Sequence, residues 1–243
     1  MKTERILYFM VSFCICISFA NTYGQHDLKN GRDVEEVYQK FPGRVDTLLS
    51  SIDLDFNGLE KVKTARAAGD VVAACKELLN YFHDAKTAQF LRREIPAPST
   101  QTVPGADSIL QGIFTFYDAP AAVPSRLSGR LDWNYRGPAD DIEWAWGLNR
   151  HYHLQTLLDA YFKTGNAVYA KTIDLHIRDW VISSLPYPAK KSSTEMWRGL
   201  EVSFRVKVWA RVFFGLMESG YLSPATQLLL LTSLTEHTHY LRN

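Results

Sequence analysis

The sequence predicts an all-α protein. Over most of the 243 residues, apolar side chains recur with the period of an α-helix rather than with the alternation of a β-strand. The clearest stripe, at positions i, i+4, i+7, i+8 and i+11, consists of Val71, Cys75, Leu78, Leu79 and Phe82. Short loops rich in glycine and proline separate the helical segments. Because helices joined by short loops pack as antiparallel neighbours, we expect a series of helical hairpins.

The first residues of the chain have the pattern of an export signal. Lys2 and Arg5 precede the apolar run ILYFMVSFCICISFA, which is too short for a comfortable membrane span, and polar residues follow. Residues 1–24 are therefore predicted to be a signal peptide. The protein is expected to be exported, periplasmic or secreted, with no stable membrane span once the signal has been removed.

Charge and cysteine content exclude several classes of protein. The chain has 27 basic and 26 acidic residues, and residues 1–24 contain two of the basic and one of the acidic ones, so the remainder is balanced. No basic run indicates a nucleic-acid partner. Beyond the signal, Cys75 is the single cysteine, so no internal disulfide can form, and its place in an apolar stripe predicts a small core residue.

Two segments precede the main helical part. Residues 25–93 read as an N-terminal helical segment, in which Gly69 interrupts the helical pattern and Asp70 is a candidate N-cap. Residues 94–141 form a connection that holds six of the ten prolines and many aromatic side chains. We expect one short strand in it, at the sequence IFTFY, and we expect the connection to lie at the mouth of a cleft.

Residues 142–243 are predicted to be helical throughout. The expected helices cover residues 142–163, 167–184 and 194–219, and a fourth runs from Pro224 to the end of the chain. Gly165 follows the first of them at a position that suits a left-handed cap. The run Leu228–Leu231 is apolar on several sides, so we expect an uncovered apolar face and an isolated chain that is either marginally stable or self-associating. The sequence does not predict the oligomeric state.

Candidate binding residues gather where the aromatic side chains are densest, since all six tryptophans lie between positions 133 and 209. The strongest pattern there is W-R-x-L-E-x-x-x-R, which comprises Trp197, Arg198, Glu201 and Arg205. Helical spacing allows Glu201 to orient one or both guanidinium groups, and an oriented arginine binds a carboxylate or a sulfate in bidentate fashion. An indole beside it offers a flat apolar surface for a pyranose ring. The alternative is an Arg–Glu–Arg ladder that only ties helices together.

The preceding helix supplies weaker candidates, Asn149 and Arg150, close to Trp146 and His153. Two H-x-H pairs occur, His151/His153 and His237/His239. On a helix the two histidines of each pair point about 200° apart, so neither pair can chelate a metal. Motifs for nucleotide, zinc or serine-hydrolase sites do not occur. The sequence therefore predicts the wall of a cleft for a sugar chain, with neither a metal nor a cofactor.

Several short motifs occur in an order that resembles a known family. They are D-W at 132–133, E-W at 143–144, L-N-R-H at 148–151, A-Y-x-x-T-G at 160–165, D-W at 179–180 and W-R-x-L-E at 197–201. Over roughly residues 33–243 the chain resembles the heparinase II/III-like polysaccharide lyases, in particular their N-terminal α/α-toroid domain. An exported glycan-degrading enzyme also agrees with the signal peptide.

The resemblance implies β-elimination on a glycan that contains uronic acid, such as heparin or heparan sulfate. In such enzymes an Asn/His pair neutralises the uronate carboxylate, and a tyrosine or histidine transfers protons. Arg198 is implied as a substrate contact, with Asn149 and Arg150 as weaker ones. The family places the neutralising pair and the tyrosine beyond the helix that resembles residues 224–242. We therefore expect an incomplete α/α toroid with no catalytic residue.

Two alternatives remain from the residues themselves. The first is a non-catalytic helical carbohydrate-binding protein that uses the same cleft wall. The second is a helical scaffold in which the tryptophans and arginines only pack. Loss of fold on Arg198→Ala would favour the scaffold, whereas binding without turnover would favour the binding protein.

Overall fold

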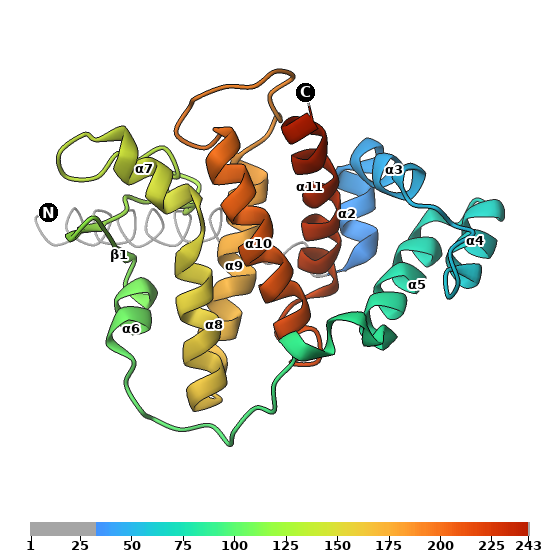
Figure 1. Cartoon of the computed structure of the whole chain (residues 1–243), viewed down its shortest axis with the longest axis horizontal. Coiled ribbons are helices and arrows are strands. Elements are labelled where there is room, and N and C mark those ends of the chain that lie inside the picture. Colours follow the sequence, from blue (N-terminus) through green and yellow to red (C-terminus); the bar gives the residue numbers. More distant parts are fainter. Residues whose placement is uncertain (1–32, 243) are drawn as a thin grey trace, which may run out of the picture.

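A computed structural model describes residues 33–242 (Figure 1). The predicted signal peptide, residues 1–24, lies outside the described residues. The N-terminal part is a group of short helices, which Figure 1 shows at one side of the molecule. These helices are α2 (Val34–Lys40), α3 (Pro42–Ser51), α4 (Glu60–Ala67), α5 (Val71–Asp84) and the 3-10 helix η1 (Lys86–Leu91).

The first part of the chain follows its local sequence signals closely. The Asp70 carboxylate accepts a hydrogen bond from the Ala73 backbone N–H at 2.9 Å, as expected of an N-cap. Cys75 is fully buried, as its place in the apolar stripe predicts. Helix α5 packs against α4 and α2, and α2, α3 and α5 each contact the last helix of the chain.

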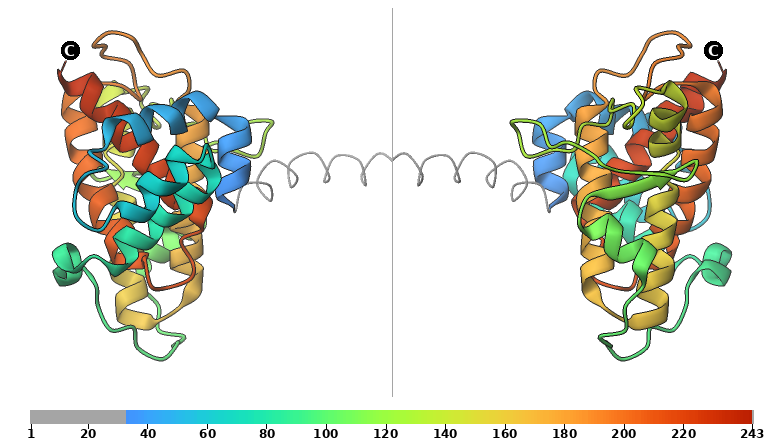
Figure 2. Two further views of the ribbon diagram at one scale, coloured as in Figure 1. Left: turned by 90° about the vertical axis from the view of Figure 1, so that its right-hand side faces the viewer. Right: turned by 90° about the vertical axis from the view of Figure 1, so that its left-hand side faces the viewer.

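The proline-rich connection contains more regular structure than expected. The predicted strand is confirmed as β1 (Ile113–Phe116), which pairs antiparallel with β2 (Ala119–Ala122) in a two-stranded hairpin. A short helix, α6 (Pro104–Leu110), was not expected, because its Pro-Gly start resembles a turn. Figure 2 shows the hairpin and α6 lying over the helices that follow in sequence.

The C-terminal part consists of long helices arranged side by side (Figure 1). They are α7 (Ile142–Asn149), α8 (Tyr152–Thr164), α9 (Ala167–Ser183), α10 (Gly199–Leu216) and α11 (Pro224–Arg242). Helix α8 packs against α9 and α10, and α11 packs against the same two helices, so helices two apart in the chain lie side by side as well as some consecutive ones. Gly165 has the left-handed φ of 64° expected of a helix cap, and a Cβ there would collide with the carbonyl oxygen of Pro96.

The prediction of one helix over residues 142–163 was wrong, because the chain breaks between α7 and α8. His151 adopts a left-handed conformation with a φ of 64°. Two contacts from α10 hold this break: the Trp209 indole N–H donates to His151 Nδ1 at 2.8 Å, and Arg205 Nη1 donates to the Asn149 carbonyl oxygen at 2.6 Å. The prediction for residues 194–219 was too long at both ends, since α10 covers Gly199–Leu216.

The last helix is central to the core. Leu228, Leu229, Leu230 and Leu231 are all buried, against α2, α3, α5, α9 and α10. The uncovered apolar face expected at these leucines was therefore a wrong prediction, because the N-terminal helices cover it. Among residues 33–242, no helix is both long enough and apolar enough to cross a membrane.

Candidate functional site

One buried carboxylate holds two arginines at the surface near the break between α7 and α8. The Glu201 side chain, in the first turn of α10, is completely buried. Its Oε1 accepts from Arg150 Nε and Nη2 at 3.2 and 3.0 Å. Arg198 donates from Nε to Oε2 at 2.5 Å and from Nη2 to Oε1 at 2.6 Å. The predicted pair of Arg198 and Glu201 is confirmed, and Arg150 joins it.

The two ion pairs keep all three groups charged. Burial alone would raise the pKa of Glu201, but the hydrogen bonds from Arg198 and Arg150 outweigh it and leave that pKa below its ordinary value. The bond to Glu201 raises the pKa of Arg198. For Arg150, burial lowers the pKa, and the contacts with Glu201 and Tyr117 more than reverse that effect. Both guanidinium groups are therefore permanent cations with fixed directions.

An indole supports the first of these arginines. The Arg198 guanidinium lies 3.4 Å from the centre of the Trp146 ring, within the range of a cation–π contact. The Trp146 N–H donates to the Thr194 carbonyl oxygen at 3.1 Å, which fixes the ring. A Glu143 oxygen lies 4.0 Å from Arg198 Nη1, beyond hydrogen-bond distance. The Arg198 side chain keeps 25% of its surface exposed.

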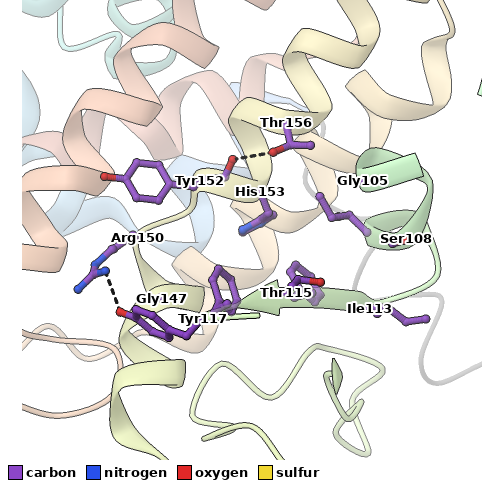
Figure 3. A pocket seen from close by; sticks show the side chains of 13 residues that line it. Gly105, Ser108, Ile113, Thr115, Tyr117, Gly147, Arg150, Tyr152, His153 and Thr156 are labelled. Carbon is purple, nitrogen blue, oxygen red and sulfur yellow. Dashed lines mark hydrogen bonds between the residues drawn. The ribbon is translucent and has the colours of Figure 1, made fainter. Parts of the chain in front are cut away.

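Tyr117 completes the cluster from the turn between β1 and β2. Its hydroxyl accepts a hydrogen bond from Arg150 Nη1 at 3.1 Å, which is drawn in Figure 3, and lies 3.5 Å from Glu143 Oε2. The sequence places this connection at the mouth of a cleft, but nothing in it marks this tyrosine. We name the group Tyr117, Trp146, Arg150 and Arg198 the arginine face.

Asn149, a weaker candidate from the sequence, points into the interior. It is fully buried, and its amide N–H groups donate to the carbonyl oxygens of Trp133 and Ala145 at 2.8 and 2.9 Å. Its side-chain oxygen accepts from the Trp180 indole at 2.7 Å. These bonds use both ends of the amide, so Asn149 connects three segments of the protein.

Arg205 is likewise enclosed. It is fully buried, donates from Nε to His237 Nε2 at 3.0 Å, and contacts the Asn149 carbonyl as described above. Its guanidinium lies 4.1 Å from the centre of the Trp180 ring. Burial lowers its pKa to about 9, and no carboxylate of residues 33–242 bonds to it directly to reverse that effect. Its geometry is that of a buried cation that organises the tryptophan core and the helix break.

Trp197 is also part of the interior, with 5% of its surface exposed. Its ring packs edge-on against Tyr187, with centroids 4.6 Å apart, and contacts Tyr240. Because it precedes α10 in the chain, it does not share a helical face with Glu201. Six residues were predicted to bind the glycan. Three of them, Arg150, Arg198 and Glu201, contact one another near the surface, and the other three, Asn149, Arg205 and Trp197, pack in the interior. Their binding of a glycan stays a prediction.

A pocket of about 400 Å³ opens beside the arginine face, between the hairpin, α6, α7 and α8 (Figure 3). Its lining includes the side chains of Phe114, Tyr117, Arg150, Tyr152 and His153. His151 and His153 were expected to point apart, but the left-handed backbone at His151 brings their rings to 5.4 Å. Within residues 33–242, no group of three His, Cys, Asp or Glu residues could hold a metal ion.

Comparison with known proteins identifies the family. The family model for the heparinase II/III N-terminus matches residues 48–243. The chain belongs to the heparinase II/III family. A heparin-sulfate lyase of Pedobacter heparinus is 29% identical over 198 residues, which are 78% of this chain and 30% of that protein. A heparin-sulfate lyase of Bacteroides stercoris is also 29% identical, over 66% of this chain and 26% of its own length.

Solved structures agree with this assignment. The crystal structure of heparan sulfate lyase HepC from Pedobacter heparinus superposes with a TM-score of 0.65 and 28% identity, covering 80% of this chain and 31% of that one. The chain thus spans about a third or less of the length of these heparinase relatives. Its helical hairpins are those of an α/α toroid, which confirms the predicted fold class.

Proposed function

We propose that the protein is the N-terminal part of an exported polysaccharide lyase that cleaves uronic-acid-containing glycans, similar to heparin or heparan sulfate, by β-elimination. The observation that carries the proposal is the arginine face on a chain of the heparinase II/III family. Relatives named heparin-sulfate lyase support the class of substrate. The predicted signal at residues 1–24 supports export to the periplasm or the medium.

The arginine face suits directed recognition of acidic groups. Glu201 takes the Nε and Nη2 groups of Arg198, which leaves the Nη1 group for a ligand carboxylate or sulfate. Trp146 lies under the same guanidinium and adds an aromatic ring at the level of a bound sugar. Because Glu201 and Glu143 offset the charge of the two arginines, attraction depends on oriented N–H groups more than on a broad positive field.

The chain supplies binding groups in this proposal and no proton-transfer group. Elimination removes the C5 proton of a uronate and breaks the C4–O bond, so that a C4–C5 double bond forms and the departing oxygen takes up a proton. A group that neutralises the carboxylate makes the C5 proton more acidic. The resemblance places that group and the catalytic tyrosine further along the toroid. Arg198 and Arg150 would hold neighbouring acidic groups and so fix the position of the chain being cut.

The binding step is tested by titrating the protein with heparan sulfate in a calorimeter. Arg198→Gln removes one charge-assisted contact, which is worth about 1.5–3 kcal/mol, and is expected to weaken binding by about tenfold or more. Arg211→Gln is the matched control, since Arg211 is a partly exposed arginine paired with Asp159 at 2.6 Å outside the arginine face. Equal effects of the two substitutions would show that only overall charge matters and would overturn the proposal.

The elimination step is tested by the ultraviolet absorbance of the C4–C5 double bond. The measurement uses the gene product with all of its coding sequence, and a uronate polymer as substrate. Appearance of the double bond supports the lyase. Tight, Arg198-dependent binding without any double bond would instead favour the non-catalytic carbohydrate-binding protein.

A further inference from the structure

We propose that the pocket between the hairpin and α8, which we name the His153 pocket, binds one hexuronate unit, with His153 on its hydroxyl groups and Arg150 on its carboxylate. The inference rests on the proposed function for the class of ligand. It adds a second subsite beside the arginine face, because Arg150 belongs to both.

His153 is the first observation. It lines the pocket, is 96% buried, and both of its ring nitrogens lack a hydrogen-bond partner among the described residues. Nearly all buried polar side chains have a partner, so each exception needs an explanation. The neighbouring Phe114 and Trp133 rings, with centroids 5.1 and 5.9 Å from the imidazole, provide aromatic surface but no such partner. Figure 3 shows the imidazole directed from α8 toward β1, across the pocket.

The protonation state of His153 decides which group it would meet. Burial, together with the nearby His176, holds its pKa well below the ordinary value, so the ring is neutral at pH 7. A neutral imidazole offers one N–H donor and one nitrogen acceptor. A sugar hydroxyl also donates and accepts, so one hydroxyl can pair with a His153 ring nitrogen whichever of the two functions that nitrogen has. An anion at this depth would find one donor and no cation, so the acidic group of the ligand belongs at the mouth.

The mouth of the pocket supplies the cation. Arg150 keeps 17% of its side-chain surface exposed, and its Nη1 group donates to the Tyr117 hydroxyl. Tyr117 and Asp118, at the hairpin turn, have φ values of 51° and 58°. Positive φ at both central residues is the ordinary geometry of a two-residue hairpin turn, and it fixes the direction in which Tyr117 leaves the hairpin. Here the turn places a tyrosine hydroxyl against the guanidinium that would meet the carboxylate.

The size and the walls fit a single pyranose ring. A pocket of about 400 Å³ lies at the lower end of the range for small-molecule sites. Phe114 and Tyr152 are aromatic lining residues, and Ser108, Thr115 and Thr156 are also in the lining. A pyranose has a weakly polar face and a rim of hydroxyl groups. The pocket therefore matches a sugar acid better than a fully apolar ligand or an inorganic anion.

The experiment titrates the full chain with methyl glucuronide, and with methyl glucoside as the neutral control. Binding is followed by the NMR signals of the His153 ring and by calorimetry. We expect millimolar affinity for the glucuronide, a shift of the His153 signals, and about tenfold weaker binding of the glucoside, which lacks the carboxylate. A glucuronide that leaves the His153 signals unchanged, or that binds no better than the glucoside, would overturn the inference.

Two variants locate the contacts. His153→Phe keeps a planar ring among aromatic neighbours and removes both nitrogens, and Arg150→Gln removes the cation. Each is expected to weaken glucuronide binding by about tenfold, and Arg150→Gln should also abolish the preference over the glucoside. Unchanged glucuronide affinity in a folded His153→Phe protein would contradict the assignment. The wild-type NMR titration remains decisive if that variant does not fold.

Failure of this inference can be told apart from failure of the proposed function. Heparan sulfate that binds through Arg198, together with a glucuronide that does not bind, would overturn the His153 pocket and leave the lyase proposal standing. Glucuronide that binds at His153, with a heparan sulfate that is neither bound nor cleaved, would support the pocket and contradict the lyase.

Discussion

Replacing Glu201 with Gln keeps the shape of the side chain and removes the charge that both arginines share. Breaking a buried ion pair from one side costs about 3–5 kcal/mol. Arg150 and Arg198 keep 17% and 25% of their side chains exposed, so water can partly replace the carboxylate. We therefore expect the free energy of unfolding to fall by about 3 kcal/mol, at the lower end of that range. For a domain of this size, that loss lowers Tm by about 6–12 °C.

Glu143→Gln provides the matched control for this measurement. Glu143 is a second carboxylate near Arg198, at 4.0 Å, but half of its side chain is exposed. A surface pair contributes little, so its loss should change the free energy of unfolding by less than about 0.5 kcal/mol. The assay is urea unfolding followed by tryptophan fluorescence. Equal changes in the two variants would refute the view that burial of Glu201 makes it the structural centre of the arginine face.

Three further changes test the support around the site. Gly165→Ala places a Cβ against the Pro96 carbonyl at a positive φ, so it should lower the free energy of unfolding by more than about 2 kcal/mol. Gly220 also has a positive φ but faces open space, so Gly220→Ala should lower it by about 1 kcal/mol. Thermal melting compares the two variants. Asn149→Ala leaves an indole N–H and two carbonyl oxygens in the interior without the Asn149 side chain as a partner. The free energy of unfolding in urea should therefore fall by about 3 kcal/mol. A fall of less than about 1 kcal/mol would contradict the interior role of Asn149. Because burial lowers the pKa of His176 from 6.5 to about 4, the unfolded chain takes up the proton first as the pH falls. Stability should therefore decrease between about pH 6.5 and pH 4, by about 3 kcal/mol from this residue, and urea midpoints that are flat across this window would contradict that.

Much of the fold follows from local signals. The sequence marks helix ends at Asp70, Gly165 and Pro224, and the structure has helix ends at these positions. The break after α7 gave no such signal, because the apolar pattern continues across it. Trp209 and Arg205, more than fifty positions further along the chain, stabilise the left-handed turn. The periodicity of apolar residues does not reveal contacts between residues so far apart in the sequence.

The candidate site could be predicted only in part for the same reason. The spacing of Arg198 and Glu201 indicates a contact within one helical turn, and it forms. The second arginine, Arg150, is 51 positions away from Glu201 in the sequence. Tyr117, which contacts Arg150, lies in a hairpin turn further away still. Sequence also could not separate the interior Arg205 from the surface arginines, because its burial depends on the tryptophans that pack around it.

The most direct test of the central claim is a crystal structure of the protein with a heparan sulfate tetrasaccharide. We predict an acidic group of the glycan on Arg198 Nη1, a sugar ring near Trp146, and Glu201 still bonded to both arginines. A tetrasaccharide bound elsewhere on the protein, with the arginine face unchanged and open to solvent, would contradict it.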